Sequence, residues 1–248
     1  MTKFASMIIV SAFALSAQAV QENDSRYFEL TKVKTEDVTA EYNTRAAIMS
    51  GQPGLVESCS PAEKPLLAVT STDTPAPSLD PLSVIEVTVD RIINIGKKIW
   101  GIMDAGRPVI NVTSITANAL PQGLTCWSDL AGWNVPESKV YRVTYENGFG
   151  ADVVRFAYRV SWTAGGNLDG VGKYLTNANI APADVHVSWG FNLNASGEVP
   201  SVFNTGTKEK PVAGMQMLMK WQVKSVVTEK INTESFYVGG DNMMKKLE

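Results

Sequence analysis

The second half of the chain alternates apolar and polar side chains with a period of two. In one stretch Val154, Phe156, Tyr158, Val160 and Trp162 alternate with charged or small residues. Successive side chains of a strand point to opposite faces of a sheet, so the pattern predicts strands with one buried face and one exposed face. The same alternation predicts further strands at 109–116, 141–146, 185–193, 199–203, 215–223 and 226–238.

Short clusters of Gly, Asn, Asp and Pro separate most of these strands. They lie at 147–148, 165–167, 169–170, 194–197 and 206–211. About seven or eight antiparallel strands with frequent turns are typical of a β-sandwich, which is the fold class that we predict for residues 107–248. A small outer-membrane β-barrel shows the same alternation, with its apolar face toward lipid, and is the alternative. Uneven strand lengths and the charged end Lys245–Glu248 favour the sandwich.

One amphipathic helix is predicted at residues 82–106, before the β domain. Asp80 can cap its N-terminus, Pro81 suits the first helical position, and Gly106 and Pro108 supply a stop. Apolar residues recur at steps of three and four, which is the spacing of one helix face. These residues are Ile85, Val89, Ile92, Ile99 and Met103.

The region from 20 to 81 has weak patterning. Residues 27–33 predict a short strand and residues 38–49 a short helix. Residues 61–81 contain five prolines among many Ser and Thr residues, which is typical of an extended linker. We therefore expect a weakly structured N-terminal region that ends in a Pro-rich segment.

Residues 1–19 have the three parts of a cleavable signal peptide. Lys3 supplies the positive end, the stretch from Phe4 to Leu15 is short and uncharged, and small residues precede a cleavage site after Ala19. The apolar stretch is shorter than the ~20 residues of a membrane-spanning helix, and no later segment predicts one. The sequence therefore predicts a secreted or periplasmic protein.

Charge and cysteine content agree with an exported protein that does not bind nucleic acid. Without Lys3, 21 basic residues face 25 acidic ones, so the mature chain carries about four net negative charges. Cys59 and Cys126 are the only cysteines, and an even count in an oxidising compartment predicts one disulfide. The closed loop of about 68 residues corresponds to roughly 4 kcal/mol in the chain-entropy account.

Candidate catalytic residues are few. Asp184, His186 and Ser188 share one face of a predicted strand and have the residue types of a hydrolase triad, and His186 is the only histidine. Same-face neighbours on a strand stand ~6.5–7 Å apart, whereas a triad needs contacts of ~2.6–3.2 Å. A secreted hydrolase using His186 is therefore an alternative to a non-catalytic protein, and we name no catalytic residue.

A loop beside Cys126 is the first candidate for binding a ligand. Its indoles could stack on a sugar ring while polar neighbours bind the hydroxyl groups; its alternative role is packing against one end of the sandwich. The loop residues that we single out are Trp127, Asp129, Trp133 and Asn134. Tyr174 and Asn177 are second candidates, because a predicted loop over 165–183 is long for a compact β domain.

Motifs for cofactors and metals are absent from the sequence. It has no Walker loop, dinucleotide fingerprint or zinc motif, and Asn167–Gly170 predicts a turn rather than a calcium loop. Asn111 and Asn194 match the glycosylation pattern, which matters only in a eukaryotic source. We therefore expect a non-catalytic binding or recognition module, without cofactor or metal, whose partner is a protein or glycan on a cell surface or in the envelope. A structural envelope protein is a further alternative.

Overall fold

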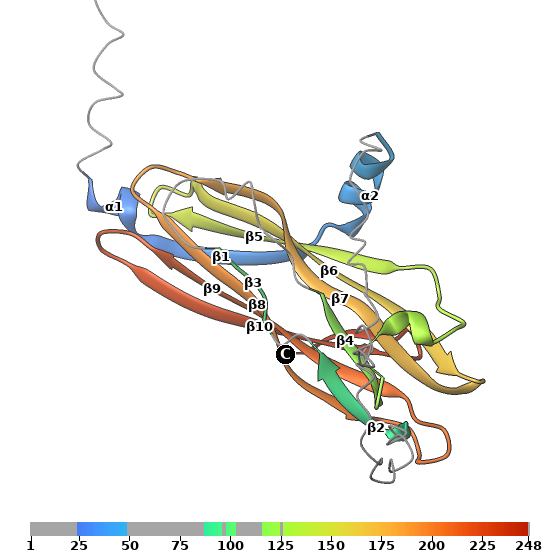
Figure 1. Cartoon of the computed structure of the whole chain (residues 1–248). Helices are drawn as coiled ribbons and strands as arrows, with labels where there is room; N and C mark the ends of the chain where they lie inside the picture. Colours follow the sequence, from blue (N-terminus) through green and yellow to red (C-terminus); the bar gives the residue numbers. More distant parts are fainter. Residues whose placement is uncertain (1–23, 49–86, 96–97, 103–115, 125, 248) are drawn as a thin grey trace, which may run out of the picture.

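The computed structural model describes residues 24–48, 87–95, 98–102, 116–124 and 126–247. These residues form two antiparallel sheets packed face to face (Figure 1). Sheet A has the strand order β1 (Leu30–Asp37), β5 (Glu137–Asn147), β6 (Asp152–Leu168), β7 (Val171–Val187), β4 (Ala117–Gln122) and β2 (Thr88–Ile95). Sheet B has the order β11 (Met244–Leu247), β10 (Glu229–Gly239), β9 (Ala213–Lys224), β8 (Asn192–Asn204) and β3 (Lys98–Ile102). The helical elements are α1 (Ser25–Phe28), α2 (Thr39–Ile48) and the 3₁₀ turn η1 (Trp127–Asp129).

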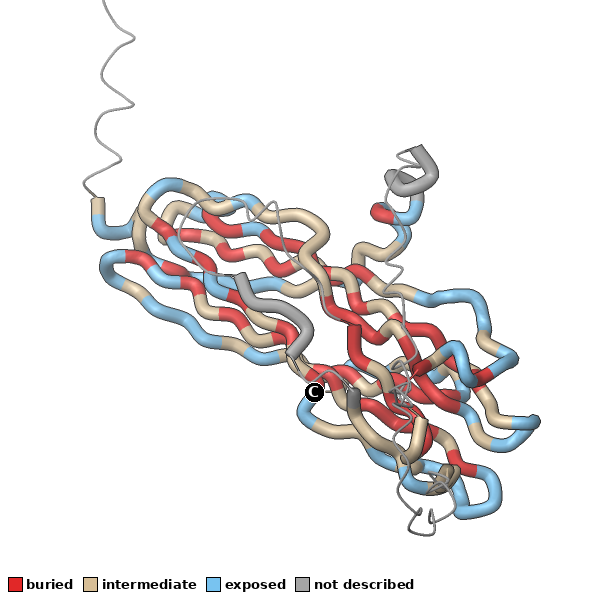
Figure 2. Tube along the Cα trace, viewed as in Figure 1, coloured by how far each residue is buried: buried red, intermediate tan, exposed pale blue. Residues whose placement is uncertain are grey.

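The two sheets bury one apolar layer between them (Figure 2). Phe156 of sheet A lies edge-on to Trp221 of sheet B with ring centroids 5.5 Å apart, and Met217 and Met219 of sheet B are fully buried. Complete burial of one such side chain stabilises the fold by about 1.5–3 kcal/mol. The predicted antiparallel β-sandwich is confirmed, with eight described strands after residue 107.

The predicted helix at 82–106 is wrong. Its described residues form β2 and β3, which belong to different sheets. More than half of the residues of β2 are β-branched, among them Thr88, Val89 and Ile92, and such residues favour strands because their side chains restrict the helical rotamers. Val89 and Ile92, three residues apart, are out of phase in a regular strand, and the pairing of β2 with β4 shifts register between Thr88 and Ile92. This irregularity gave the sequence the apolar spacing of a helix face.

Residues 24–48, the described part of the N-terminal region, are more structured than predicted and belong to the β domain. β1 pairs along its length with β5, so it forms an edge of sheet A rather than a separate unit. The predicted short helix is confirmed as α2, whose Tyr42 packs on Val140 and Ala157 on the outer face of sheet A. The predicted strand starts later than expected, because Tyr27 and Phe28 belong to α1.

The hairpin at Asn147 is confirmed, although its turn is longer than the two-residue form. Asn147 Oδ1 accepts hydrogen bonds from the backbone N–H groups of Phe149 and Ala151, both at 3.0 Å. Gly150, rather than Asn147 or Gly148, takes the positive φ, at +77°. A three-residue loop that ends in a left-handed glycine has this geometry.

Two predicted boundaries in the β domain are wrong. The alternation from 185 to 193 crosses a chain reversal, with Val187 ending β7 and Asn192 starting β8. Gly190 permits the reversal with φ +83°, and Trp189 keeps the alternating phase by coincidence. The predicted turn at 194–197 lies inside β8, because Gly197 pairs there with Met219.

Several predictions concern residues outside the described ones. These are the signal peptide at 1–19, Cys59, the Pro-rich segment 61–81, Asn111 and nearly all of the predicted strand 109–116. Within the described ranges, no helix combines the length and apolar character needed to cross a membrane.

Candidate functional site

The segment 126–136 connects β4 to β5 and lies against the end of β6. Ala131 and Asn167 exchange two backbone hydrogen bonds, at 3.0 and 2.8 Å, and the backbone N–H of Asn134 donates to Ala164 O at 2.8 Å. Asn167 Nδ2 also donates to Ala131 O at 3.0 Å. Backbone contacts with a sheet therefore hold this segment, which we call the tryptophan loop, in one conformation.

Both tryptophans of the loop are half-buried and pack against the core. Trp133 Nε1 donates to Trp127 O at 3.2 Å, and the Trp133 ring lies on Gly166 so closely that a Cβ at that glycine would overlap it. Glycine is required here by close approach rather than by an unusual φ. Both indoles therefore pack against the core of the sandwich, which is the alternative role considered for them.

The polar residues of the loop are exposed to solvent. Ser128, Asp129 and Asn134 are exposed, and Asp129 lies at the end of η1 beside Trp127. Asp129 therefore places a carboxylate two residues from the half-buried Trp127, and the Asn134 amide lies over Gly165, 3.0 Å from where a Cβ of that glycine would stand. Such a surface can accept and donate hydrogen bonds while an aromatic ring supplies an apolar contact.

Cys126 opens the loop and is buried, with 3% of its surface exposed. Ser128 Oγ donates to its Sγ at 3.0 Å. Cys59 lies outside the described residues, so the disulfide between Cys59 and Cys126 stays a prediction. A bond at this position would fasten residue 59 to the base of the tryptophan loop.

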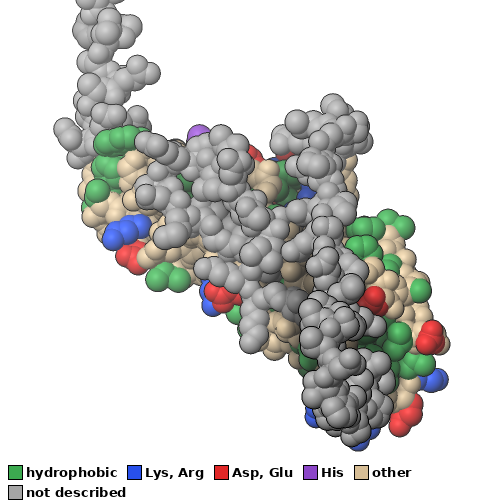
Figure 3. All heavy atoms as spheres, viewed as in Figure 1, with side chains coloured by type: hydrophobic (Ala, Val, Ile, Leu, Met, Phe, Trp, Pro, Cys, Tyr) green, Lys and Arg blue, Asp and Glu red, His purple; other side chains and the backbone are tan. Residues whose placement is uncertain are grey.

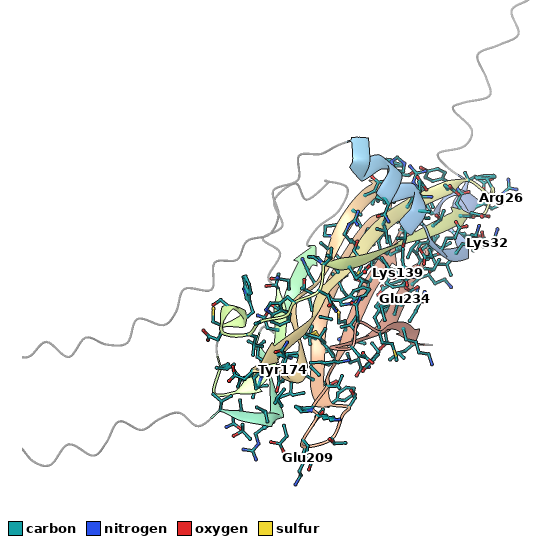
Figure 4. All side chains as sticks on the ribbon, turned by 90° about the vertical axis from the view of Figure 1, so that its right-hand side faces the viewer. Arg26, Lys32, Lys139, Tyr174, Glu209 and Glu234 are labelled. Atoms are coloured by element: carbon teal, nitrogen blue, oxygen red, sulfur yellow. The ribbon has the colours of Figure 1, made fainter. Side chains whose placement is uncertain are left out.

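Tyr174 and Asn177 do not lie in a loop. β6 and β7 continue through this region as 17-residue strands and are joined by a two-residue turn, where Asp169 has φ +50° and Gly170 has φ +82°. Tyr174 is fully buried and its hydroxyl donates to Val89 O at 2.7 Å, so it is not available to a ligand (Figure 4).

Asn177 is half-buried and has φ +51° where β7 meets β4, and its N–H donates to Asn118 Oδ1 at 3.2 Å. Irregular pairing between β6 and β7 breaks the period of two over this stretch, which made these strands resemble a loop in the sequence.

The hydrolase candidates do not form a catalytic group. Asp184 and His186 are part of β7, and Ser188 follows its end. His186 is exposed and lies opposite Arg155 in the sheet. Among the described residues, no hydrogen bond or ion pair joins the side chains of Asp184, His186 and Ser188, as expected when same-face neighbours on a strand stand ~6.5–7 Å apart.

A polar contact between the sheets was not predicted from the sequence. The hydroxyl of Tyr158 donates to the carboxylate of Glu234, and Lys246 Nζ lies 2.9 Å from the same carboxylate. Glu234 is labelled in Figure 4. Burial, together with the negative charge of Glu234, raises the pKa of Tyr158 far above its usual value. Glu234 is in phase with the buried Phe236 and Val238, so a charged residue at an inward strand position is the signal that could have revealed the contact.

A second contact of this kind lies nearby. Tyr145 Oη accepts hydrogen bonds from Trp221 Nε1 at 2.9 Å and from Asn232 Nδ2 at 2.5 Å. Burial again raises the tyrosine pKa. Both tyrosines stay neutral and form hydrogen bonds with partners in the other sheet. Their role is therefore structural rather than acid–base.

Metal binding has no support in the described part of the chain, where no cluster of three or more His, Cys, Asp and Glu side chains could hold an ion. In comparisons with known proteins, the chain matches no family model, no curated protein and no solved structure. We therefore infer the role of the tryptophan loop from its geometry alone.

Proposed function

We propose that this protein is exported and acts outside the cytoplasm as a non-catalytic recognition module, with the tryptophan loop as its binding surface. The observation that carries the proposal is the combination of a fixed loop backbone with exposed polar side chains beside half-exposed indoles. A surface that is already ordered loses little conformational entropy when a ligand binds. Binding residues are common on loops that a rigid scaffold positions.

The chemistry of the loop favours a glycan as its ligand. One face of a sugar ring is apolar and packs on an aromatic side chain, while its hydroxyl groups bind carboxylates and amides. Trp127 supplies the ring, and Asp129 and Asn134 supply an acceptor and a mixed donor–acceptor group. Trp133 stabilises the loop itself, because its Nε1 already donates to Trp127 O.

The test is a binding screen of the exported protein against an array of neutral and acidic oligosaccharides, followed by titration calorimetry with the glycans that bind. A double variant, Asp129→Ala with Asn134→Ala, keeps both tryptophans and all the backbone contacts of the loop. We expect it to weaken binding at least tenfold, which corresponds to about 1.4 kcal/mol. A loss of one or two hydrogen bonds to a ligand, one of them charged, accounts for this amount.

A matched control is available at the other end of the sandwich. Asp152 and Asn192 are also exposed, and the double variant Asp152→Ala with Asn192→Ala removes the same chemical groups there. It should bind as the parent does. Equal binding by parent and loop variant would exclude the loop as the site, and an array without any bound glycan would exclude the proposed ligand class.

A further inference from the structure

The end of the sandwich beside α1 exposes three apolar side chains. Trp189 is 68% exposed, Val226 76% and Val227 54%. Hydrophobic side chains are visible at this end of the molecule, next to the start of the described chain (Figure 3). Single exposed apolar residues are ordinary, but a group of them at one place indicates an interaction surface.

All three residues lie in turns, where polar residues are usual. Trp189 is in the turn from β7 to β8, and Val226 and Val227 are in the turn from β9 to β10. The segments Ser188–Gly190 and Ser225–Thr228 contain no charged residue. The turns themselves depend on other groups: Ser225 Oγ accepts from the N–H groups of Val227 and Thr228, at 3.2 and 3.0 Å.

Phe28 of α1 joins the two turns into one surface. Its ring centroid lies 6.0 Å from that of Trp189, and its carbonyl oxygen accepts a hydrogen bond from Ser225 Oγ at 2.6 Å. Tyr27 Oη also donates to Trp189 O at 3.2 Å. We call the surface formed by Phe28, Trp189, Val226 and Val227 the apolar tip; these contacts hold it in place while its outer side chains face solvent.

The position of the tip in the chain indicates its partner. α1 begins at Ser25, so the tip carries the start of the folded domain. The apolar stretch Phe4–Leu15 precedes α1, and the nine residues 16–24 between them can span at most ~32 Å. While the stretch Phe4–Leu15 is in the membrane during export, the tip is the part of the domain held closest to the bilayer.

We infer that the apolar tip binds the surface of a lipid bilayer by inserting Trp189, Val226 and Val227 at the boundary between headgroups and acyl chains. Tryptophan is enriched at this boundary because its ring is apolar and its N–H is polar, and the valines add apolar area beside it. The uncharged turns make the contact a hydrophobic one that needs no anionic lipid.

The geometry places the tryptophan loop away from such a membrane. Ser188 N donates to Val153 O at the tip end of β6, whereas the loop contacts Ala164 and Asn167 at its other end. The eleven residue steps along the strand from Val153 to Ala164 correspond to roughly 36 Å. Arg26 beside the tip and Glu209 lie at opposite ends of the molecule (Figure 4). A domain attached through the tip would present the loop outward.

The test is co-sedimentation of the purified exported protein with phosphatidylcholine vesicles. We expect the parent to bind, and the double variant Val226→Ser with Val227→Ser and the single variant Trp189→Ser each to lower the partition coefficient at least about tenfold, given the apolar area that each removes. The valine pair is not part of the core, so its replacement should leave the thermal unfolding transition in place. Val135→Ser is the matched control, because Val135 is 80% exposed in the tryptophan loop, and its binding should equal that of the parent.

Three outcomes would overturn the inference. The first is no binding of the parent, or equal binding of parent and tip variants. The second is binding that requires phosphatidylglycerol in the vesicles and disappears with added salt, since that dependence indicates charge rather than apolar insertion. The third is a parent dimer that the tip variants convert to monomer in light scattering without any vesicle binding. Glycan binding by the tip variants should be unchanged, so failure here is distinct from failure of the tryptophan loop.

Discussion

The contact between Gly166 and Trp133 is the point at which the tryptophan loop can be disturbed without touching any exposed residue. A Cβ on Gly166 would lie 2.5 Å from Cζ3 of the Trp133 ring, and closer still to Cζ2 and Cη2. Gly166 has no positive φ, so alanine fits its backbone and the whole effect is steric. The ring would have to retreat by more than ~1 Å to reach an ordinary contact distance.

Gly166→Ala should therefore lower the free energy of unfolding by about 2–4 kcal/mol. Overpacking costs about 1–3 kcal/mol, and displacement of the ring adds the loss of the hydrogen bond from Trp133 Nε1 to Trp127 O, about 1 kcal/mol. For a domain of this size the melting temperature falls by about 2–4 °C for each kcal/mol. Urea unfolding followed by circular dichroism measures the change without depending on tryptophan emission.

A double-mutant cycle identifies the cause. In the Gly166→Ala background Trp133→Ala should cost much less than in the parent, because the ring has already been displaced. Gly150→Ala is the control: a Cβ there meets nothing within 4 Å, but φ is +77°, so we expect about 1–2 kcal/mol of backbone strain that adds independently to Trp133→Ala. If Gly166→Ala is neutral, or if its cost simply adds to that of Trp133→Ala, the tryptophan loop is not held by this contact.

Two further predictions concern the tyrosines and the cysteines. Burial raises the pKa of Tyr141 and of Tyr174 to about 12, above the unfolded value near 10. Their contribution to the free energy of unfolding is therefore complete below pH ~10 and is lost as the pH rises through ~12. Near-ultraviolet phenolate absorbance should show a fraction of tyrosines that ionises only as the protein unfolds. Non-reducing peptide mass spectrometry of the exported protein should find Cys59 linked to Cys126, and reduction should lower the free energy of unfolding by roughly 4 kcal/mol; two alkylatable thiols in the folded protein would refute the pairing.

Local sequence signals predicted a turn well where its conformation depends only on the residues of the turn itself. Asp169-Gly170 forms a two-residue turn with positive φ at both residues, as their small or flexible side chains allow. Asn147 forms its hairpin with its own side chain. Trp189 shows the limit of alternation: its phase predicted an inward position, but the reversal at Gly190 exposes it, and a period of two does not record a change of chain direction.

The segment 126–136 was predicted correctly to be a loop, but its contacts were predicted only in part. The proximity of Trp127 to Asp129 follows from their places in the chain. The position of Trp133 on Gly166 depends on pairing between residues far apart in sequence, which no local pattern encodes. Tyr174 was misassigned for the same reason, since its partner Val89 lies in a strand that was predicted as a helix.

The sequence by itself determined that the chain forms antiparallel strands with one apolar face, because alternation and turn residues act over a few positions. It also predicts an export signal, because a positive charge, a short apolar stretch and small residues lie together at 1–19. Tertiary structure decided which residues the strands bury and which they leave out, from the Tyr158–Glu234 contact between the sheets to the exposed Trp189. The physical reason is that burial depends on which segments meet after folding, and segments far apart in the chain meet only when both sheets have formed.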